Sequence, residues 1–403
     1  MDTVGVKMFF NEVPEGKPDP VFGLSGVFKA DVRPHKVDLM VGIYKDENLL
    51  SKLLGSVKEA KKRLFPQDLP ADYLPFDGIP AFYDALGGLI FGKNLWKDLH
   101  PRTYCSQALG GTGALRLGGE FLFQEIGQTI YIPHPTWSNH RQVFEKVGFH
   151  VETYPYYNRE KKAFDCDAMC EKLLTLSPKT IVLLHATCHN PSGRDPTLPQ
   201  WKKIFAAMQK KELIPFFDCA YQGFGDGLEK DTEALRLCLS FCREILVAYS
   251  CSKNFSLYNE RVGALYLVTD HSAAKMRVGS QVKRIIRVLY SNPPSSGARI
   301  VAEILQDSKL TQQWTLEVDA MRHRIVSMRS ELISRLVAKS PHFQYLQGHS
   351  GLFMFVDLTK PQVDLLIHEY GVYLLDNGRI SVAGLNQKNI DCVVDSIAKV
   401  SQP

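Results

Sequence analysis

The sequence predicts an α/β fold: a large, mostly parallel sheet covered by helices, together with a smaller α+β unit. Short runs rich in Val, Ile, Leu and Phe recur through the middle of the chain, and amphipathic segments separate them. Such near-continuous apolar runs are typical of strands buried on both faces, as in a parallel sheet covered by helices. After residue 300 a long helical stretch precedes two further strand-like runs, which indicates the second unit.

Four apolar runs define the expected central strands, at residues 180–186, 213–217, 244–249 and 264–269. The segment at residues 198–212, between the first two strands, has apolar side chains at helical spacing.

The remaining elements suggest how the chain divides. We expect a helix at residues 310–339 and strands within residues 351–358 and 371–385. The large domain is therefore expected at residues 46–298. The smaller domain, which includes an N-terminal arm, is expected from both chain ends, at residues 1–45 and 299–403.

The composition excludes several classes of protein. The 403-residue chain has a formal net charge of +5, with Lys and Arg interleaved with Asp and Glu, so we expect no nucleic-acid binding. No apolar run reaches the ~18 residues that span a bilayer, so we expect no membrane partner. Nine cysteines without a C-x-x-C pair or a matching His pattern predict reduced thiols and no metal site. The N-terminus lacks a signal-like segment, and we expect a cytoplasmic location.

Polar residues follow three of the expected strands. Ligands of open α/β sheets bind at the carboxyl ends of the strands, so these residues are candidates for a site. They are His185, His189 and Asn190 after the first strand, Asp218 and Tyr221 after the second, and Ser250, Ser252 and Lys253 after the third.

A glycine-rich turn at residues 110–113 directly precedes an amphipathic helix. It does not match a Rossmann fingerprint, because the third glycine position is occupied by Arg116, and it lacks the Lys of a Walker A loop. Free backbone N–H groups at a helix N-terminus nevertheless form a cradle for phosphate. Ser250 and Arg261 can add donors to such a cradle.

A lysine, an aspartate and a phosphate cradle at one sheet edge are what pyridoxal 5'-phosphate requires. The Lys253 amine can react with the cofactor aldehyde. Asp218 can pair with the protonated pyridine nitrogen and so keep the ring an electron sink. Asn190 and Tyr221 can hydrogen-bond to the 3-oxygen of the ring.

Longer motifs run through nearly the whole chain: "VGIY", "DYLPFDGIPAF", "GGTGALRLG", "PTWSNH", "HATCHNPSGRDPT", "DCAYQGF", "SKNFSLYNERVG", "YSNPPSSGAR" and "NGRISVAGL". In these motifs the chain resembles the aspartate aminotransferase family of fold-type I pyridoxal-phosphate enzymes, including its aromatic amino-acid branch. The resemblance implies a homodimer with shared active sites. It also implies ping-pong transfer of the amino group between L-aspartate, or an aromatic amino acid, and 2-oxoglutarate.

The resemblance assigns the cofactor site residue by residue. Lys253 resembles the Schiff-base lysine that also carries the proton, and Asp218 resembles the partner of the pyridine nitrogen. His189 resembles the relay histidine behind that aspartate, whereas His140 receives no role and His185 is expected to pack. The further contacts that the resemblance implies are the 3-oxygen ligands Asn190 and Tyr221, the stacking ring of Trp137, the phosphate clamp of Gly111, Thr112, Ser250, Ser252 and Arg261, and a catalytic Tyr73 that reaches the phosphate of the neighbouring subunit.

Two arginines define the substrate in the same way. Arg379 resembles the residue that binds the substrate α-carboxylate as a fork, and Arg287 resembles the one that takes the distal carboxylate across the dimer interface. Gly42 is expected to leave room for substrate, with Phe353 packed near Arg379. Trp137 and Asn190 are expected to touch substrate as well as cofactor.

Departures from the family pattern leave the choice between aspartate and aromatic donors open. Gly110 stands where many relatives have Ser, and Ser256 replaces a glycine common in aspartate-preferring members. Same-fold lyases or decarboxylases are the nearest alternatives, but they need not retain both carboxylate arginines. A non-catalytic relative would be expected to lack Lys253 or Asp218, and both are present.

Overall fold

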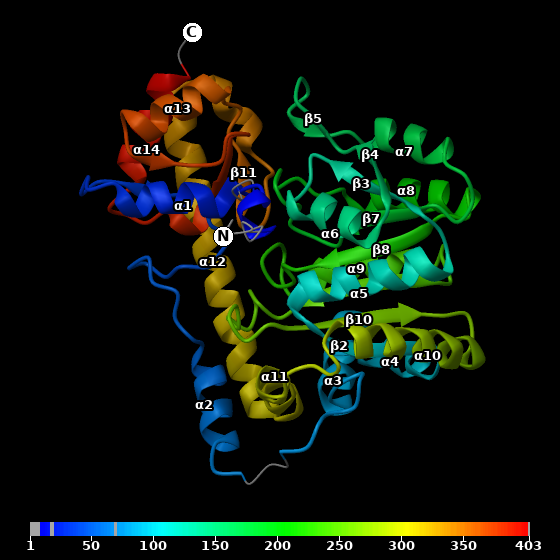
Figure 1. Ribbon diagram of the computed structural model, residues 1–403. Helices are drawn as coiled ribbons and strands as arrows, with labels where there is room; N and C mark the ends of the chain where they lie inside the picture. The colour runs from blue at the N-terminus through cyan, green and yellow to red at the C-terminus, as the bar shows by residue number, and fades with distance from the viewer. Residues whose placement is uncertain (1–8, 17–19, 68–70, 402–403) are drawn as a thin grey trace, which may run out of the picture.

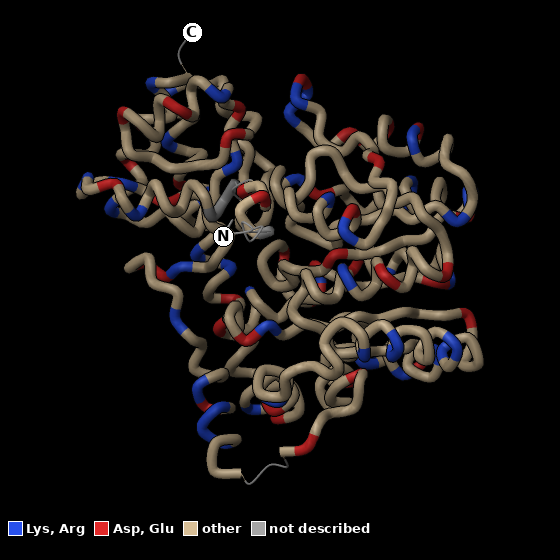
Figure 2. Tube along the Cα trace, in the orientation of Figure 1, with Lys and Arg blue, Asp and Glu red and all other residues tan. Residues whose placement is uncertain are grey.

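The computed structural model describes residues 9–16, 20–67 and 71–401, and Figure 1 shows its two halves side by side. Residues 1–8 and 17–19 of the expected N-terminal arm lie outside the described residues. Within the described ranges, no helix combines the length and apolarity needed to cross a membrane. Segments with Lys or Arg alternate with segments with Asp or Glu over most elements of both halves (Figure 2).

A seven-stranded sheet forms the centre of the larger half, in the order β2-β10-β9-β8-β7-β3-β4. Neighbouring strands from β9 to β4 are parallel, whereas β10 is antiparallel to both β2 and β9. The α/β fold class is thereby confirmed. The strands are β2 (Thr103–Leu109), β3 (Thr129–His134), β4 (His150–Pro155), β7 (Ile181–His185), β8 (Ile214–Cys219), β9 (Ile245–Ser250) and β10 (Val262–Val268).

Helices cover both faces of this sheet, as the continuous apolar runs predict. Successive residues of a strand point to opposite faces. Along β7, Ile181 and Leu183 join one apolar cluster, while Val182 and Leu184 join another on the opposite face. The helices of this half are α2 (Gly55–Leu64), α3 (Pro80–Phe91), α4 (Lys93–Leu99), α5 (Gly110–Glu125), α6 (Asn139–Val147), α7 (Cys166–Leu174), α8 (Leu198–Lys210), α9 (Glu233–Cys238), α10 (Ser272–Leu289) and α11 (Ser296–Gln306).

A smaller core combines the two ends of the chain. Residues near the N-terminus, such as Val37 and Met40, pack with apolar side chains from residues 325–400. Strand β1 pairs in parallel with β12, and β11 pairs antiparallel with β13. The elements here are α1 (Pro20–Ala30), β1 (Val37–Asp38), α12 (Ser308–Lys339), β11 (Phe353–Phe355), α13 (Lys360–His368), β12 (Val372–Tyr373), β13 (Arg379–Ser381) and α14 (Ile390–Val400).

The remaining elements are short and lie within one or the other of these two units. A two-stranded hairpin lies on the larger half, and five short 3₁₀ helices are found in the described ranges. They are β5 (Tyr157–Asn158), β6 (Ala163–Phe164), η1 (Phe9–Glu12), η2 (His100–Arg102), η3 (Lys230–Thr232), η4 (Pro341–Leu346) and η5 (Val382–Gly384).

The long helix α12 belongs to both cores, and this corrects the expected boundary at residue 298. Side chains from Leu310 to Met321 pack into the larger core together with α11. Side chains from Ile325 to Leu336 pack into the smaller core. One continuous helix can serve two cores because its apolar face simply meets different partners along its length. The change of core therefore falls inside a helix, where the sequence has no break.

Ser256 adopts a backbone conformation that favours glycine. Its φ is +51°, in the left-handed region, and its N–H donates to the carbonyl of Lys253 at 3.1 Å. The residue is buried, yet it is absent from the lining of the cavity described below. This turn sits between Lys253 and Arg261, so the unusual serine bears on loop geometry.

Replacing Ser256 by glycine should stabilise the protein. The left-handed conformation costs a non-glycine residue about 1–2 kcal/mol. Glycine removes this cost, but it loses more conformational entropy on folding, which destabilises the folded state by about 0.5–1 kcal/mol. We expect Ser256→Gly to raise the free energy of unfolding by about 0.5–1 kcal/mol in denaturant titrations, a difference of the two figures above. Ser256→Ala keeps the strain and serves as the control. A glycine variant no more stable than the alanine variant would contradict this explanation.

Candidate active site

A cavity of about 410 Å³ opens at the carboxyl ends of β7, β8 and β9. It gathers side chains from both the larger core and the smaller core. The expected site residues that line it are Gly42, Gly111, Thr112, Trp137, Asn190, Asp218, Tyr221, Ser250, Ser252, Lys253, Arg261, Phe353 and Arg379. Val41, Ile43, Leu115 and Tyr258 are among the lining residues that the sequence did not single out, and His185, a candidate that was expected only to pack, lines the cavity as well.

Lys253 projects into this cavity from the turn that follows β9. Its Nζ lies 4.8 Å from the centre of the Tyr221 ring. Burial lowers the pKa of the Lys253 amine to about 8, although the nearby Asp218 carboxylate opposes this shift. A pKa near 8 leaves part of the amine unprotonated near neutral pH, which a nucleophile or proton acceptor requires.

Asp218 lies at the end of β8 and is buried. His140 Nε2 donates a hydrogen bond to Asp218 Oδ2 at 2.9 Å. Burial by itself raises the pKa of this carboxyl, but the His140 hydrogen bond and the positive charge of Lys253 bring the pKa below its usual value. The carboxylate is therefore kept as an anion inside the protein.

The expected role of His189 behind Asp218 is wrong, because His140 occupies that place. The His189 ring instead stacks on Tyr156, with ring centres 3.7 Å apart. Its Nδ1 pairs with Ser192 Oγ at 2.7 Å, and it does not line the cavity. The quoted motif "PTWSNH" contains His140, but nothing in the sequence shows that the first turn of α6 faces the end of β8.

A chain of hydrogen bonds fixes the tautomer of His140. The Asn190 backbone N–H donates to His185 Nδ1 at 3.4 Å, so His185 Nε2 carries the proton and donates to Thr136 Oγ1 at 3.2 Å. The Thr136 hydroxyl then donates to His140 Nδ1 at 2.8 Å, which leaves the proton of His140 on Nε2. Burial lowers the pKa of His185 to about 3, so that ring is neutral at pH 7. Each hydrogen bond in this series thus fixes the proton position of the next group, and the last group, His140, donates to Asp218.

The N-terminus of α5 and the turn after β9 form one wall of the cavity. An added Cβ at Gly111 would lie 3.0 Å from Ser250 Cβ, so the two segments touch closely. Gly110 has a φ of +71°, and an added Cβ there would lie 2.5 Å from Arg261 Nη2. Arg261 also donates to Ser252 Oγ at 3.5 Å. Backbone N–H groups, hydroxyls and a guanidinium therefore converge as an anion site requires.

Arg379 crosses the cavity from β13 and is buried. Its Nη1 donates to Asn190 Oδ1 at 3.2 Å, its Nη2 donates to the Met40 carbonyl, and its Nε has no partner among the described residues. No carboxylate within those residues pairs with it. Burial lowers the pKa of Arg379 to about 10, so the side chain is still charged at pH 7.

Phe353 packs between Arg379 and Gly42. The guanidinium carbon of Arg379 lies 4.3 Å from the centre of the Phe353 ring. An added Cβ at Gly42 would come within 2.5 Å of Phe353 Cζ, so no larger residue fits without displacing the ring. Tyr221 meets the same ring edge-on, at 5.7 Å between centres. These contacts connect the cofactor side of the cavity to its arginine side.

Tyr73 and Arg287 lie outside the cavity within this chain. The Tyr73 residue is 91% exposed. Arg287 is exposed near the end of α10, where its Nη1 donates to Ser291 Oγ at 2.5 Å and its guanidinium lies 5.8 Å from the Phe76 ring centre. Neither residue lines the cavity of its own chain.

Known proteins resemble this chain over nearly its whole length. The family model described as aminotransferase class I and II matches residues 34–397. The aspartate aminotransferase of Haemophilus influenzae is 41% identical over 97% of this chain and 100% of its own length. The aromatic-amino-acid aminotransferase of Escherichia coli K12 is also 41% identical, over 97% of this chain and 100% of its own.

Solved structures agree with this similarity. The aromatic-amino-acid aminotransferase of Burkholderia pseudomallei, covalently bound to pyridoxal phosphate, superposes with a TM-score of 0.95 at 41% identity. The superposition covers 98% of this chain and all of that one. Sequence, fold and cavity therefore lead to one conclusion: the chain belongs to the family of class I and II aminotransferases.

Proposed function

We propose that this aminotransferase moves the amino group between L-aspartate, or an aromatic amino acid, and 2-oxoglutarate by a ping-pong mechanism with pyridoxal 5'-phosphate. The observation that carries the proposal is one cavity that joins the Lys253 amine, the buried Asp218 carboxylate and Arg379, whose guanidinium pairs with no carboxylate among the described residues. Relatives named for aspartate and for aromatic amino acids are equally similar to this chain, so both donor classes are included.

The residues of the cavity fit the cofactor. When bound, pyridoxal phosphate supplies an electron sink for the carbanion that forms when the substrate loses its Cα proton. The α5 N-terminus, Thr112, Ser250, Ser252 and Arg261 would hold its phosphate. Asp218 would pair with its ring nitrogen, Trp137 would cover its ring, and Asn190 and Tyr221 would bond its 3-oxygen. Burial raises the pKa of Tyr221, so its phenol stays protonated and can donate.

Lys253 then has two tasks in the proposed reaction. With pyridoxal phosphate bound, the Lys253 amine would hold it through its aldehyde carbon, a condensation that releases water. Its free Nζ would accept the proton from the substrate Cα and would give it back later in the amino transfer. The lowered pKa of about 8 suits a group that must both accept and donate a proton near neutral pH.

Arg379 orients the substrate for this proton transfer. A guanidinium binds a carboxylate through two parallel hydrogen bonds, which fixes position and direction together. The unpartnered Nε and the absence of a nearby carboxylate in the described residues leave Arg379 available for the substrate α-carboxylate. Fixing that end of the substrate restricts where its Cα–H bond points.

We further propose that the protein is a homodimer in which Tyr73 and Arg287 complete the site of the neighbouring subunit. Both side chains are exposed, and both lie outside the cavity of their own chain. Near Arg287, α10 also exposes the large apolar side chains of Met276 and Val288, at 73% and 85%.

The expected cytoplasmic location stays a prediction. Relatives from Dictyostelium discoideum include one named cytoplasmic and one named mitochondrial, at 41% and 39% identity to this chain.

Lys253 provides the direct test of the proposed function. Wild-type protein loaded with cofactor should form glutamate from 2-oxoglutarate with aspartate, tyrosine or phenylalanine as donor. Lys253→Ala should lower turnover by at least about a thousandfold, because it loses both the covalent anchor and the proton carrier. The exposed Lys210→Ala is the control and should behave as wild type. Wild-type turnover by Lys253→Ala, or no transfer from any donor, would sink the proposal.

Thr136 offers a test of the hydrogen-bond chain behind Asp218. Thr136→Val keeps the shape of the side chain but removes the hydroxyl that donates to His140 Nδ1, so the proton of His140 is no longer held on Nε2. We therefore expect kcat to fall about tenfold with little change in KM. The lowered pKa of Asp218 depends on His140. The pKa should therefore rise in the variant, and the loss of kcat on acidification should begin at a higher pH than in wild type. Thr136→Ser retains the hydroxyl and should restore both values; identical pH profiles for valine and wild type would argue against the chain.

Arg287 tests the shared site. Arg287→Ala should reduce turnover of aspartate far more than turnover of phenylalanine, because only aspartate brings a second carboxylate to be paired. Dimers mixed from Arg287→Ala and Lys253→Ala subunits contain one intact site if the two residues act across the interface. Aspartate turnover of the mixture should then exceed that of both parents added together. A mixture without this gain would place Arg287 outside the neighbouring site.

A further inference from the structure

Residues 40–47 form a wall of the cavity without forming a helix or a strand. Val41, Gly42 and Ile43 line the cavity directly. A segment without regular structure has no ladder of backbone hydrogen bonds to hold it, so its order depends on the side chains that bind its backbone. Besides a local bond from the Met40 N–H to Asp38 Oδ1 at 3.0 Å, three such contacts from distant described residues hold the segment, at its start, its middle and its end.

The first two contacts come from residues of the cavity itself. Arg379 Nη2 donates to the Met40 carbonyl at the start of the segment. In the middle, the Tyr44 backbone N–H donates to Tyr258 Oη at 2.9 Å. Both side chains also line the cavity, so their contacts are sensitive to whatever binds there.

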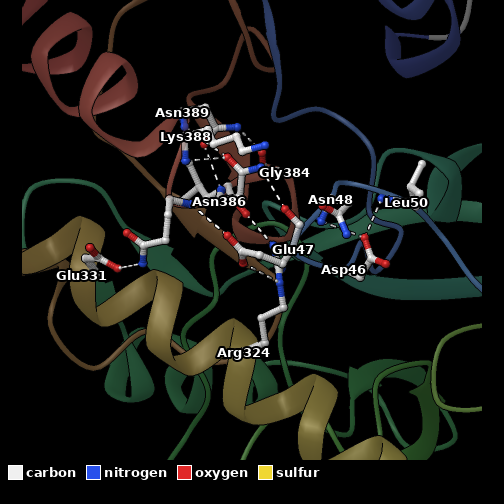
Figure 3. A network of polar contacts seen from close by, with 12 residues as sticks. Asp46, Glu47, Asn48, Leu50, Arg324, Glu331, Gly384, Asn386, Lys388 and Asn389 are labelled. Atoms are coloured by element: carbon white, nitrogen blue, oxygen red, sulfur yellow. Dashed lines mark hydrogen bonds and ion pairs between the residues drawn. The ribbon is translucent and has the colours of Figure 1, made fainter.

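The third contact lies away from the cavity, and Figure 3 shows it in the loop that follows η5. Asn386 Nδ2 donates to the Glu47 carbonyl at 3.0 Å. Asn386 is only 5% exposed, and its Oδ1 accepts from the backbone N–H groups of Lys388 and Asn389, each at 3.1 Å. These two bonds occupy the oxygen and so direct the amide nitrogen toward Glu47.

Neighbouring side chains hold Glu47 from the other directions. Its carboxylate accepts from the Gln387 backbone N–H at 3.1 Å and pairs with Arg324 Nε at 3.5 Å. Arg324 donates from Nη2 to the Leu385 carbonyl at 2.7 Å, and its guanidinium lies 5.9 Å from the centre of the Tyr44 ring. The Glu47 side chain is 53% exposed, so its ion pair is weak, whereas the Asn386 bond is buried.

We propose that Asn386 is a positioning residue for substrate binding, acting through Glu47 on the lining residues Val41, Gly42 and Ile43. The proposal rests on the proposed function for the identity of the substrate. Arg379 and Asn386 lie seven positions apart in the sequence. Together they hydrogen-bond to both ends of the segment at residues 40–47. The segment is thereby held in its binding shape before substrate arrives. Apparent affinity falls in proportion when the binding-competent shape is less populated.

Asn386→Asp isolates this contact from the other bonds of Asn386. The aspartate still accepts from Lys388 and Asn389 at the start of α14, but it turns an oxygen instead of an N–H toward the Glu47 carbonyl. Loss of one hydrogen bond of ordinary strength shifts such an equilibrium by up to about tenfold. We expect KM for the amino-acid donor to rise about three- to tenfold, with kcat within about twofold of wild type. Asn386→Ala should show the same rise in KM.

Hydrogen–deuterium exchange of the cofactor-loaded enzyme without substrate gives a second readout. Backbone exchange at residues 40–47 should become at least about threefold faster in Asn386→Asp, whereas exchange in β8 and α5 should not change. Gln387→Ala is the matched control: it removes the 2.7 Å bond from Gln387 Nε2 to Glu331 but leaves the Glu47 contact intact, so both KM and exchange should match wild type.

Unchanged exchange at residues 40–47 in Asn386→Asp, or a fall in kcat without a rise in KM, would overturn the assignment. The assignment would also be overturned if Asn386→Asp had wild-type KM and exchange while Asn386→Ala had a raised KM. That pattern would mean that Asn386 serves only to order the start of α14. Failure of the proposed function looks different: wild-type enzyme would then transfer no amino group from any donor, and the exchange measurement would still decide whether Asn386 orders the segment.

Discussion

The hydrogen bond between His140 and Asp218 is the interaction on which the chemistry of this site depends. A carboxylate taken out of water loses several kcal/mol of solvation unless other groups compensate for it. Asp218 sits at the end of a central strand with little contact with solvent, so an uncompensated carboxyl there would take up a proton. A neutral acid could not stabilise a positive charge on a bound pyridine ring. The proton on His140 Nε2 is what keeps Asp218 ionised.

The fold supplies the site by bringing two separate cores to one cavity. The larger core contributes the cofactor side through the ends of β8 and β9, which present Asp218 and Lys253. The smaller core contributes Arg379 from β13, and Phe353 from β11 lies between the two groups. The long helix α12 packs into both cores and so ties their positions together. Arg379 is buried and pairs with no carboxylate in the part of the chain that the structure describes, and such a costly placement indicates a functional role.

Much of this arrangement is predictable from the sequence, and the features that are not predictable have identifiable physical causes. Lys253 and Asp218 follow strongly apolar strands, and topology alone brings strand ends together at one edge. The partner of Asp218 is a different problem, because His140 comes from a helix whose rotation and tilt the sequence does not state. His189, the more obvious histidine by sequence, is turned onto Tyr156 by packing. The domain boundary was misplaced because α12 passes between cores without a break in its pattern.

Asn190 connects the two ends of the cavity through its side chain and its backbone. Its side-chain oxygen accepts from Arg379, while its backbone N–H begins the chain of donors that ends at Asp218. A substrate carboxylate that binds Arg379 must compete with that side-chain bond. A shift of Asn190 would then alter the donor to His185 and, through Thr136, the hydrogen bond of His140. The side chain of Asn190 thus serves the arginine side of the site, and its backbone N–H serves the aspartate side.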